Sequence, residues 1–195
     1  MAVDPRGDQA APGYSPSRRA FLTGGAAAST AAILSACGGA GPLREKVRAG
    51  GKVAKSDLEP LNSLLDVEHY AVAAYAAGIP LLHQDQAKAA EQFLAQELAH
   101  TVQLSDLIRR VGGKPHRPMA SYALGQPRNS SDVMALLTRI EQTQLRAYLE
   151  TLPRLEGSGS RTAAVSIMAN DAQHLAMLRW EVGEPPVPAA LVSGH

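Results

Sequence analysis

Two ionisable side chains lie inside a helical stripe that hydrocarbon would normally fill, and this feature constrains the fold of the chain most. The stripe covers residues 93–111, and its members recur at steps of four and three residues: Phe93, Glu97, His100, Leu104, Leu107 and Val111. Burying a carboxylate and an imidazole together is costly unless they are paired, hydrogen-bonded or bound to a metal ion. We therefore expect other polar side chains to meet Glu97 and His100 in the interior.

The composition indicates one all-α domain with enough apolar side chains for a core. The chain has 195 residues, of which 45% are hydrophobic and only 4% aromatic. Its 19 basic residues are balanced by 18 acidic ones, so we expect no nucleic-acid partner. The single cysteine, Cys37, excludes an internal disulfide and any four-cysteine zinc or rubredoxin-like iron site within this chain.

The first part of the chain has the pattern of an export signal. Arg18 and Arg19 form a twin-arginine pair, which precedes a weakly apolar, Ala- and Gly-rich run over residues 24–36. The run ends in Leu-Ser-Ala before Cys37, which resembles a bacterial lipoprotein processing site. We therefore predict a twin-arginine signal peptide at 1–36 and a lipidated Cys37 that anchors the protein at the extracytoplasmic face of the cell membrane. The alternative is a twin-arginine signal with an incidental cysteine.

The rest of the chain is predicted to comprise a tether, a bundle and a tail. Residues 37–55 are rich in glycine and are expected to form a flexible tether. Residues 56–183 hold the helical domain. Residues 184–195 contain prolines that exclude a helix, so this tail is expected either to pack across the bundle or to extend freely.

Start and stop signals predict four helices. The first runs from a capping box at residues 56–59 to about 79, and the second from about 85 to the glycine pair at 112–113. The third begins at 129–132 and ends before Pro153, and the fourth runs from about 158 to about 182. The first and third links are short, whereas the second is long. This predicts an antiparallel four-helix bundle with one long crossover between the second and third helices.

The two predicted hairpins repeat one pattern. In each half a glutamate is followed by tyrosine seven residues later and by proline twelve residues later: Glu68, Tyr75 and Pro80, then Glu141, Tyr148 and Pro153. A second acid follows each glutamate: Glu97 comes 29 residues after Glu68, and Asp171 comes 30 residues after Glu141. Each of these acids is followed three residues later by a histidine, His100 and His174 respectively. An internal repeat of this kind places all of these residues at one level of the bundle.

Taken singly, each of these polar residues has a simpler explanation, such as a solvent-reaching glutamate or a hydrogen-bonded core histidine. Together they place four carboxylates and two imidazoles on inner helix faces. Carboxylates crowded in this way repel one another unless cations neutralise them. Two divalent ions carry the matching charge, which favours a dinuclear centre.

The pattern resembles that of ferritin-like di-iron and di-manganese carboxylate bundles, in particular small exported ferritin-like domain proteins of bacteria. Those bundles combine one glutamate from each of two helices with Glu-x-x-His from each of the other two. The resemblance makes Glu68 and Glu141 the single glutamates and Glu97 with His100 a complete motif. It also implies that Tyr75 and Tyr148 orient carboxylates through their hydroxyls, the alternative being core aromatics whose hydroxyls reach other polar groups. Gln144 is expected to form a hydrogen bond near the site.

The chain departs from that family at Asp171, which stands with His174 where a second Glu-x-x-His is expected. Aspartate is one methylene shorter than glutamate, so three states stay open: two bound metal ions, one, or none. Oxygen and nitrogen ligands favour iron or manganese, although zinc also fits. The residues do not predict the oligomeric state. His69, His83, His116 and His195 are assigned no role.

The resemblance implies an oxidoreductase that reduces dioxygen or peroxide, by ferroxidase, peroxidase or catalase-like chemistry. Because the chain has no Cys-x-x-Cys pair, the electrons have to come from another donor. The competing hypothesis is a metal-free, non-enzymatic envelope protein that retains the scaffold for a structural or binding role. Asp171 is the residue that most favours this alternative.

Overall fold

The computed structural model describes residues 51–191, 193 and 194, and within them the fold is entirely helical. Its four long helices are α1 (Leu58–Gly78), α2 (Gln84–Arg110), α3 (Ser130–Thr151) and α4 (Ser158–Glu181). Short 3-10 turns flank them: η2 (Lys55–Asp57), η3 (Ile79–Leu81) and η4 (Leu152–Arg154). The predicted all-α class is confirmed.

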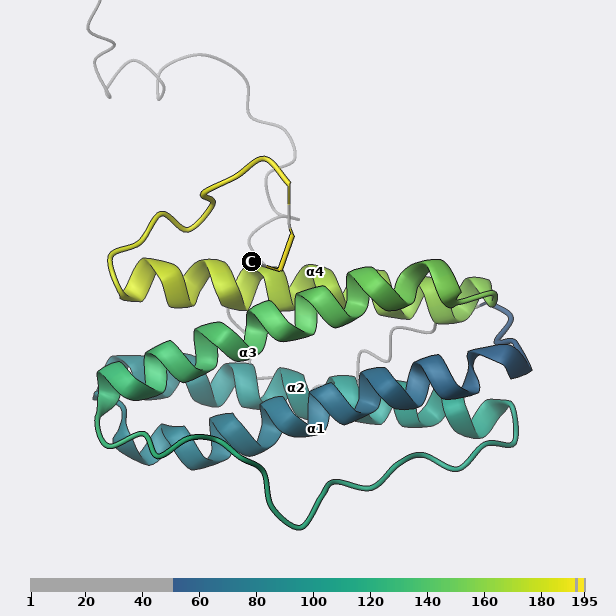
Figure 1. The fold of residues 1–195 in the computed structure, drawn as a ribbon, viewed down its shortest axis with the longest axis horizontal. Helices are drawn as coiled ribbons and strands as arrows, with labels where there is room; N and C mark the ends of the chain where they lie inside the picture. Colours follow the sequence, from purple (N-terminus) through teal and green to yellow (C-terminus); the bar gives the residue numbers. More distant parts are fainter. Residues whose placement is uncertain (1–50, 192, 195) are drawn as a thin grey trace, which may run out of the picture. The chain divides into compact units, whose positions relative to one another are not determined.

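The helices form two antiparallel hairpins, α1 with α2 and α3 with α4 (Figure 1). Between the hairpins, residues 111–129 run along the length of the bundle, as the connection lengths predicted. The crossover is fixed to α1 by Asn62, whose side chain accepts the amide of His116 at 2.8 Å, and by Tyr70, whose hydroxyl donates to the carbonyl of Ala123 at 3.1 Å.

Most helix ends follow the predicted signals. Gly112 ends α2 in the left-handed region at φ +78°, a backbone conformation that favours glycine. At the start of α3 the side chain of Asn129 accepts the amide of Asp132 at 2.9 Å, which caps the helix. These ends are set by local sequence, which is why the bounds agree closely with the prediction.

The capping box predicted at residues 56–59 does not form. Ser56 instead donates its hydroxyl to Glu156 at 2.7 Å, and Asp57, just before α1, is completely buried. One carboxylate oxygen of Asp57 accepts the amide of Glu156 at 2.7 Å, and the other accepts the hydroxyl of Ser160 at 2.6 Å. Asp57 thus joins the start of α1 to the start of α4.

Gly157 belongs to the same junction. Its amide donates to Asp57 at 3.0 Å, and a Cβ atom at this position would lie 2.5 Å from the carboxylate of Asp57. A larger side chain at 157 would therefore push the two helix starts apart.

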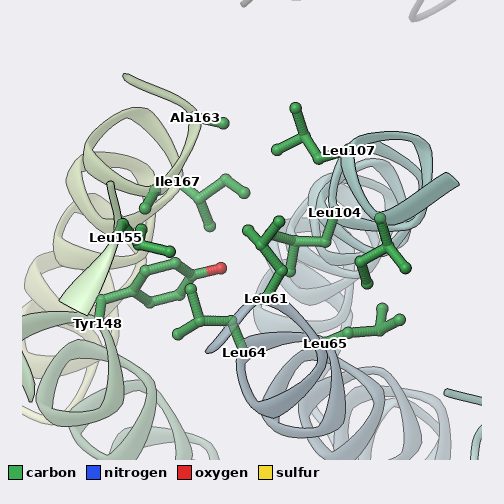
Figure 2. Packing of buried hydrophobic residues seen from close by; sticks show 11 residues of the cluster. Leu61, Leu64, Leu65, Leu104, Leu107, Tyr148, Leu155, Ala163 and Ile167 are labelled. Carbon is green, nitrogen blue, oxygen red and sulfur yellow. The ribbon is translucent and has the colours of Figure 1, made fainter. Parts of the chain in front are cut away.

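Two apolar clusters fill the interior, and the polar residues of interest fall between them along every helix. The first cluster joins the beginning of α1 and α4 to the end of α2 and α3. Figure 2 shows Leu61 and Leu64 of α1 on one side of this cluster. On the other side lie Tyr148 of α3, Ile167 of α4 and Leu155 from the link between these two helices. The second cluster, which contains Phe93, Leu137 and Leu178, fills the opposite end.

The chain beyond α4 folds back over the bundle. Arg146 of α3 donates to the carbonyl of Gly194 at 2.9 Å, and the tail and α4 enclose a mainly apolar cavity of ≈ 320 Å³. None of the described helices is both long and apolar enough to span a membrane.

Candidate metal centre

The structure brings all six predicted ligands together in the middle of the bundle. The four acids, Glu68, Glu97, Glu141 and Asp171, are completely buried. The two histidines follow closely, with His174 1% exposed and His100 8% exposed. Each helix contributes at least one of the six, because the repeat places them at corresponding depths.

The six residues form two overlapping groups of potential ligand atoms. In one group Glu68, His100 and Asp171 offer atoms that all lie within 4.8 Å of one another. In the other, Glu97, Glu141, Asp171 and His174 do the same. Because Asp171 belongs to both groups, its shorter side chain does not remove it from either one.

Both histidines turn Nδ1 toward the carboxylates. Nδ1 of His100 lies 3.3 Å from Glu68 Oε2, 3.5 Å from Asp171 Oδ1 and 3.7 Å from Glu97 Oε2. Nδ1 of His174 lies 3.1 Å from Glu97 Oε1 and 3.3 Å from Glu141 Oε1. Glu97 therefore directs one oxygen toward each histidine, which is the geometry of a shared carboxylate.

The two buried tyrosines hold the single glutamates crosswise. Tyr148 of α3 donates its hydroxyl to Oε1 of Glu68 on α1 at 2.5 Å. Tyr75 of α1 donates to Oε1 of Glu141 on α3. Burial raises the pKa of both hydroxyls well above 10, and the nearby carboxylates add to this effect. The tyrosines thus remain neutral donors that fix the direction of each glutamate.

Two amide side chains complete the surroundings. Gln144 donates to Glu97 Oε2 at 2.8 Å and to Glu68 Oε2 at 3.2 Å, in agreement with the expected hydrogen bond near the site. Gln96, which is not among the residues predicted for the site, places its Oε1 2.5 Å from Nε2 of His174. A sequence signal for it exists: Gln96 directly precedes Glu97, and in the repeat another amide, Asn170, directly precedes Asp171.

Crowding shifts the pKa values of the carboxyl groups in different directions. Burial, and then the charge of Glu97, raise the pKa of Glu68 to about 8. Burial likewise raises the pKa values of Glu141 and Asp171. Burial opposes the ionisation of Glu97, but the adjacent His100 and His174 outweigh it and lower its pKa below the usual range. Glu97 is therefore the carboxylate that stays charged most readily.

The same arrangement raises the pKa values of the two histidines, His100 and His174. Burial alone would lower the pKa of an imidazole, but the neighbouring carboxylates raise that of His100 to about 10 and that of His174 to about 9. Without a metal ion the cluster therefore holds protons at neutral pH. Metal binding requires these ligand atoms to be deprotonated, so it would release the protons.

The hydrogen-bond inventory tests whether a metal ion fits. Among the described residues, the buried side-chain nitrogen and oxygen atoms that lack a hydrogen-bond partner all belong to this cluster. They are Glu97 Oε1, His100 Nδ1, Glu141 Oε2, Gln144 Oε1, both carboxylate oxygens of Asp171, and His174 Nδ1. The two Nδ1 atoms face carboxylate oxygens at 3.1–3.7 Å, but without the geometry of a hydrogen bond. Such atoms are costly to bury unpaired, and nearly all of them are of the types that bind iron, manganese and zinc. The residues present fit a pair of divalent ions.

The other residues singled out in the sequence lie apart from the cluster or outside the described residues. His116 pairs with Asp66 at 2.9 Å on the surface, and Nε2 of His69 lies 3.4 Å from the carbonyl of His116. His83 is exposed and immediately precedes α2. Arg18, Arg19, Cys37 and His195 fall outside the described residues, so their predicted roles stay predictions.

Comparisons with known proteins agree with this architecture. A family profile described as ferritin-like domain matches residues 56–184. A crystal structure of a conserved hypothetical protein from Mycobacterium tuberculosis is similar, with a TM-score of 0.63 and 20% identity over 70% of this chain and 96% of that one. Ferritin-like, diiron-carboxylate proteins from Bacillus anthracis strain Ames give a TM-score of 0.55 and 18% identity over 64% of this chain and 94% of that one. A search among curated proteins gave no significant match.

Proposed function

Because the chain belongs to the ferritin-like domain family, we propose that it binds two divalent metal ions, iron or manganese, between its four helices and acts as an oxidoreductase. The set of unpaired ligand atoms in the buried cluster is the observation that carries this proposal. Four carboxylates would repel one another in this apolar interior, and two divalent cations would match their charge. The similar crystal structure from Bacillus anthracis is that of ferritin-like, diiron-carboxylate proteins, which supports iron as one candidate.

The residues divide between two metal positions. We name them after their histidines: the His100 position has Glu68 as its own carboxylate, and the His174 position has Glu141. Asp171 belongs to both groups of potential ligand atoms and Glu97 faces both histidines, so these two residues would be shared by both ions. A pair of bound redox-active ions would share the electrons needed to reduce dioxygen or peroxide, and an external donor such as ferrous iron would replace them.

The chain's own groups prepare this site in two ways. Tyr75 and Tyr148 hold Glu141 and Glu68 in fixed directions, so the ligands are oriented before any ion binds. The apolar clusters on both sides keep bulk water away, which strengthens every electrostatic interaction inside. The side chain of His100 is 11% exposed, more than that of His174 at 1%, so small molecules reach the centre most directly beside His100.

The competing hypothesis of a metal-free binding module depended on Asp171. Asp171 takes part in both ligand groups, and both of its oxygens lack a hydrogen-bond partner among the described residues. These observations favour the metal-binding function over a scaffold that has lost its site.

We also propose that the protein is exported by the twin-arginine route and anchored through a lipid at Cys37. The support is the sequence of residues 17–37. In a bacterium with this route, the full chain is expected in the membrane fraction, facing outward. Cys37→Ser should move the exported protein to the soluble fraction, and Arg18→Lys with Arg19→Lys should keep it in the cytoplasm. Unchanged fractionation of the Cys37→Ser variant would overturn the lipid anchor.

Elemental analysis tests the proposed metal centre. The full chain, produced in a bacterium grown with iron and manganese, should contain two metal ions per chain. Glu97→Gln keeps the shape of the shared ligand but removes its charge, so this variant should retain fewer than one ion. Glu91→Gln, an exposed change on the same helix, is the matched control and should retain two. A wild-type chain that binds no metal contradicts the proposal.

Turnover tests the redox part separately. The loaded wild type and the Glu91→Gln control should consume dioxygen in the presence of ferrous iron, or should consume hydrogen peroxide. The Glu97→Gln variant should do neither at a comparable rate. If the wild type binds two ions but consumes neither oxidant, the proposed metal centre stands and the proposed oxidoreductase activity is contradicted.

A further inference from the structure

The two histidines of the cluster are held differently, although the repeat makes them equivalent in sequence. Oε1 of Gln96 on α2 lies 2.5 Å from Nε2 of His174 on α4. The ring of Phe93 stacks on the same imidazole, with centroids 4.2 Å apart and planes at 25°. His174 is therefore fixed on its outer edge and on one face, while its Nδ1 points at the carboxylates.

His100 lacks the corresponding support. The residue that matches Gln96 in the other half is Asn170, which is one methylene shorter. Within the described part of the chain, neither the side chain of Asn170 nor Nε2 of His100 makes a hydrogen bond. The ring of His100 faces the carboxylates with its Nδ1 and lies near-parallel to the ring of His174, with centroids 6.5 Å apart, but no amide holds its Nε2 among the described residues.

Gln144 adds a second difference between the positions. Its amide donates to Oε2 of Glu68 and to Oε2 of Glu97, the same two oxygens that face His100. An ion at the His100 position has to share or displace these hydrogen bonds. Of the oxygens that face His174, Oε1 of Glu97 accepts no hydrogen bond and Oε1 of Glu141 accepts one from Tyr75, but neither accepts one from Gln144.

We infer that Gln96 is a positioning residue for His174, and that its hydrogen bond makes the His174 position the tighter of the two metal positions. By accepting Nε2–H, the carbonyl of Gln96 leaves the lone pair of Nδ1 for the metal and holds the ring in the binding direction. This inference rests on the proposed metal centre. It assigns unequal roles to the two positions, with the His174 position retaining its ion and the His100 position exchanging it with solvent.

Titration of the metal-free full chain with Co²⁺, followed by its visible absorption, tests the inference. The wild type should bind in two steps of different affinity. His100→Ala should remove the weaker step and keep the tighter one, and His174→Ala should do the reverse. Gln96→Leu should weaken the tighter step by about 10–100-fold and leave the weaker step unchanged.

Two further variants separate positioning from packing. Gln92→Leu, an exposed change one turn earlier on α2, should bind like the wild type. Gln96→Glu still offers an acceptor to Nε2–H, so it should restore tight binding, whereas a purely structural role would favour leucine over a half-buried carboxylate. In the zinc-loaded protein, the Nε2–H proton of His174 should be visible by NMR in the wild type and in Gln96→Glu, and lost to exchange in Gln96→Leu.

The possible failures are distinguishable. If the wild type binds two Co²⁺ ions and Gln96→Leu binds them equally well, the inference is wrong and the metal centre stands. If Gln96→Glu and Gln96→Leu weaken binding equally, Gln96 acts through packing and the inference is also wrong. If the wild type binds no metal, the proposed function itself fails.

Discussion

Each single glutamate of the cluster is held by a tyrosine of the opposite hairpin. Seven residues along a helix correspond to roughly 10 Å, too far for Tyr148 to reach Glu141 on its own helix. The hydroxyls cross instead, from Tyr148 to Glu68 and from Tyr75 to Glu141. The sequence pattern predicted that these tyrosines orient carboxylates, but the crosswise pairing depends on how α1 and α3 face each other.

Replacement of Tyr148 tests this pairing. Tyr148→Phe removes the hydroxyl and leaves Oε1 of Glu68 buried without its donor, so the free energy of unfolding of the metal-free protein should fall by about 1–3 kcal/mol. Tyr70→Phe, which removes a hydroxyl that binds the crossover at the surface, should cost much less. Guanidinium denaturation measures both. Equal losses in the two variants would contradict a special role for Tyr148.

Gln96 shows what residue patterns miss. Its role depends on a contact between α2 and α4 that no spacing within one helix reveals. The six predicted ligands were easier to find, because buried acids and histidines stand out in an apolar stripe. An amide beside such a stripe is common on helix surfaces, so the amides that precede Glu97 and Asp171 in the repeat are a much weaker signal.

At the scale of elements, the start of α1 shows tertiary contacts overriding a local rule. The spacing of Ser56 and Glu59 predicted a capping box. Both side chains bind residues about 100 positions away instead, since Ser56 donates to Glu156 and Glu59 pairs with Arg154 at 2.5 Å. Asp57 takes over the junction, and its partners are known only once α4 is packed against α1. Helix bounds set by glycine, proline and Asn129 were predictable because those signals are local.

The junction makes a prediction about acid stability. Burial by itself would raise the pKa of Asp57, but hydrogen bonds from Ser160 and from the amides of Glu156, Ala54 and Gly157 outweigh it and lower that pKa below its ordinary value of 3.8. A depressed carboxyl pKa contributes stability that is present above pH 3.8 and is lost as the pH falls through the lower, folded-state pKa.

Asp57→Asn should therefore lower the free energy of unfolding by about 1.5–3 kcal/mol at pH 7, because it replaces a charged acceptor of several hydrogen bonds. The difference from the wild type should shrink as the pH is lowered below 3.8. Urea denaturation at a series of pH values measures it. Asp85→Asn, at a side chain that is 96% exposed, is the control and should have almost no effect. A pH-independent loss in Asp57→Asn would contradict the assigned role.

At the scale of the whole molecule, the bundle separates two apolar clusters by one polar layer. This arrangement was predictable, because hydrophobic periodicity fixes the inner faces and the lengths of the three links fix the topology. The repeat then set the common depth of the acids and histidines. The course of residues 183–191 over α4 was not predictable, since a proline-rich segment carries no periodicity. The export signal and the lipid anchor lie outside the described residues and stay predictions.

The central claim is that two metal ions share Glu97 and Asp171 in the middle of this bundle. Anomalous scattering from crystals of the full chain loaded with manganese tests it most directly. Diffraction data collected at the manganese absorption edge should show two peaks within the cluster, about 3.5–4 Å apart, one beside His100 and one beside His174. An absence of any peak between these residues, in crystals shown to contain manganese, would contradict the account.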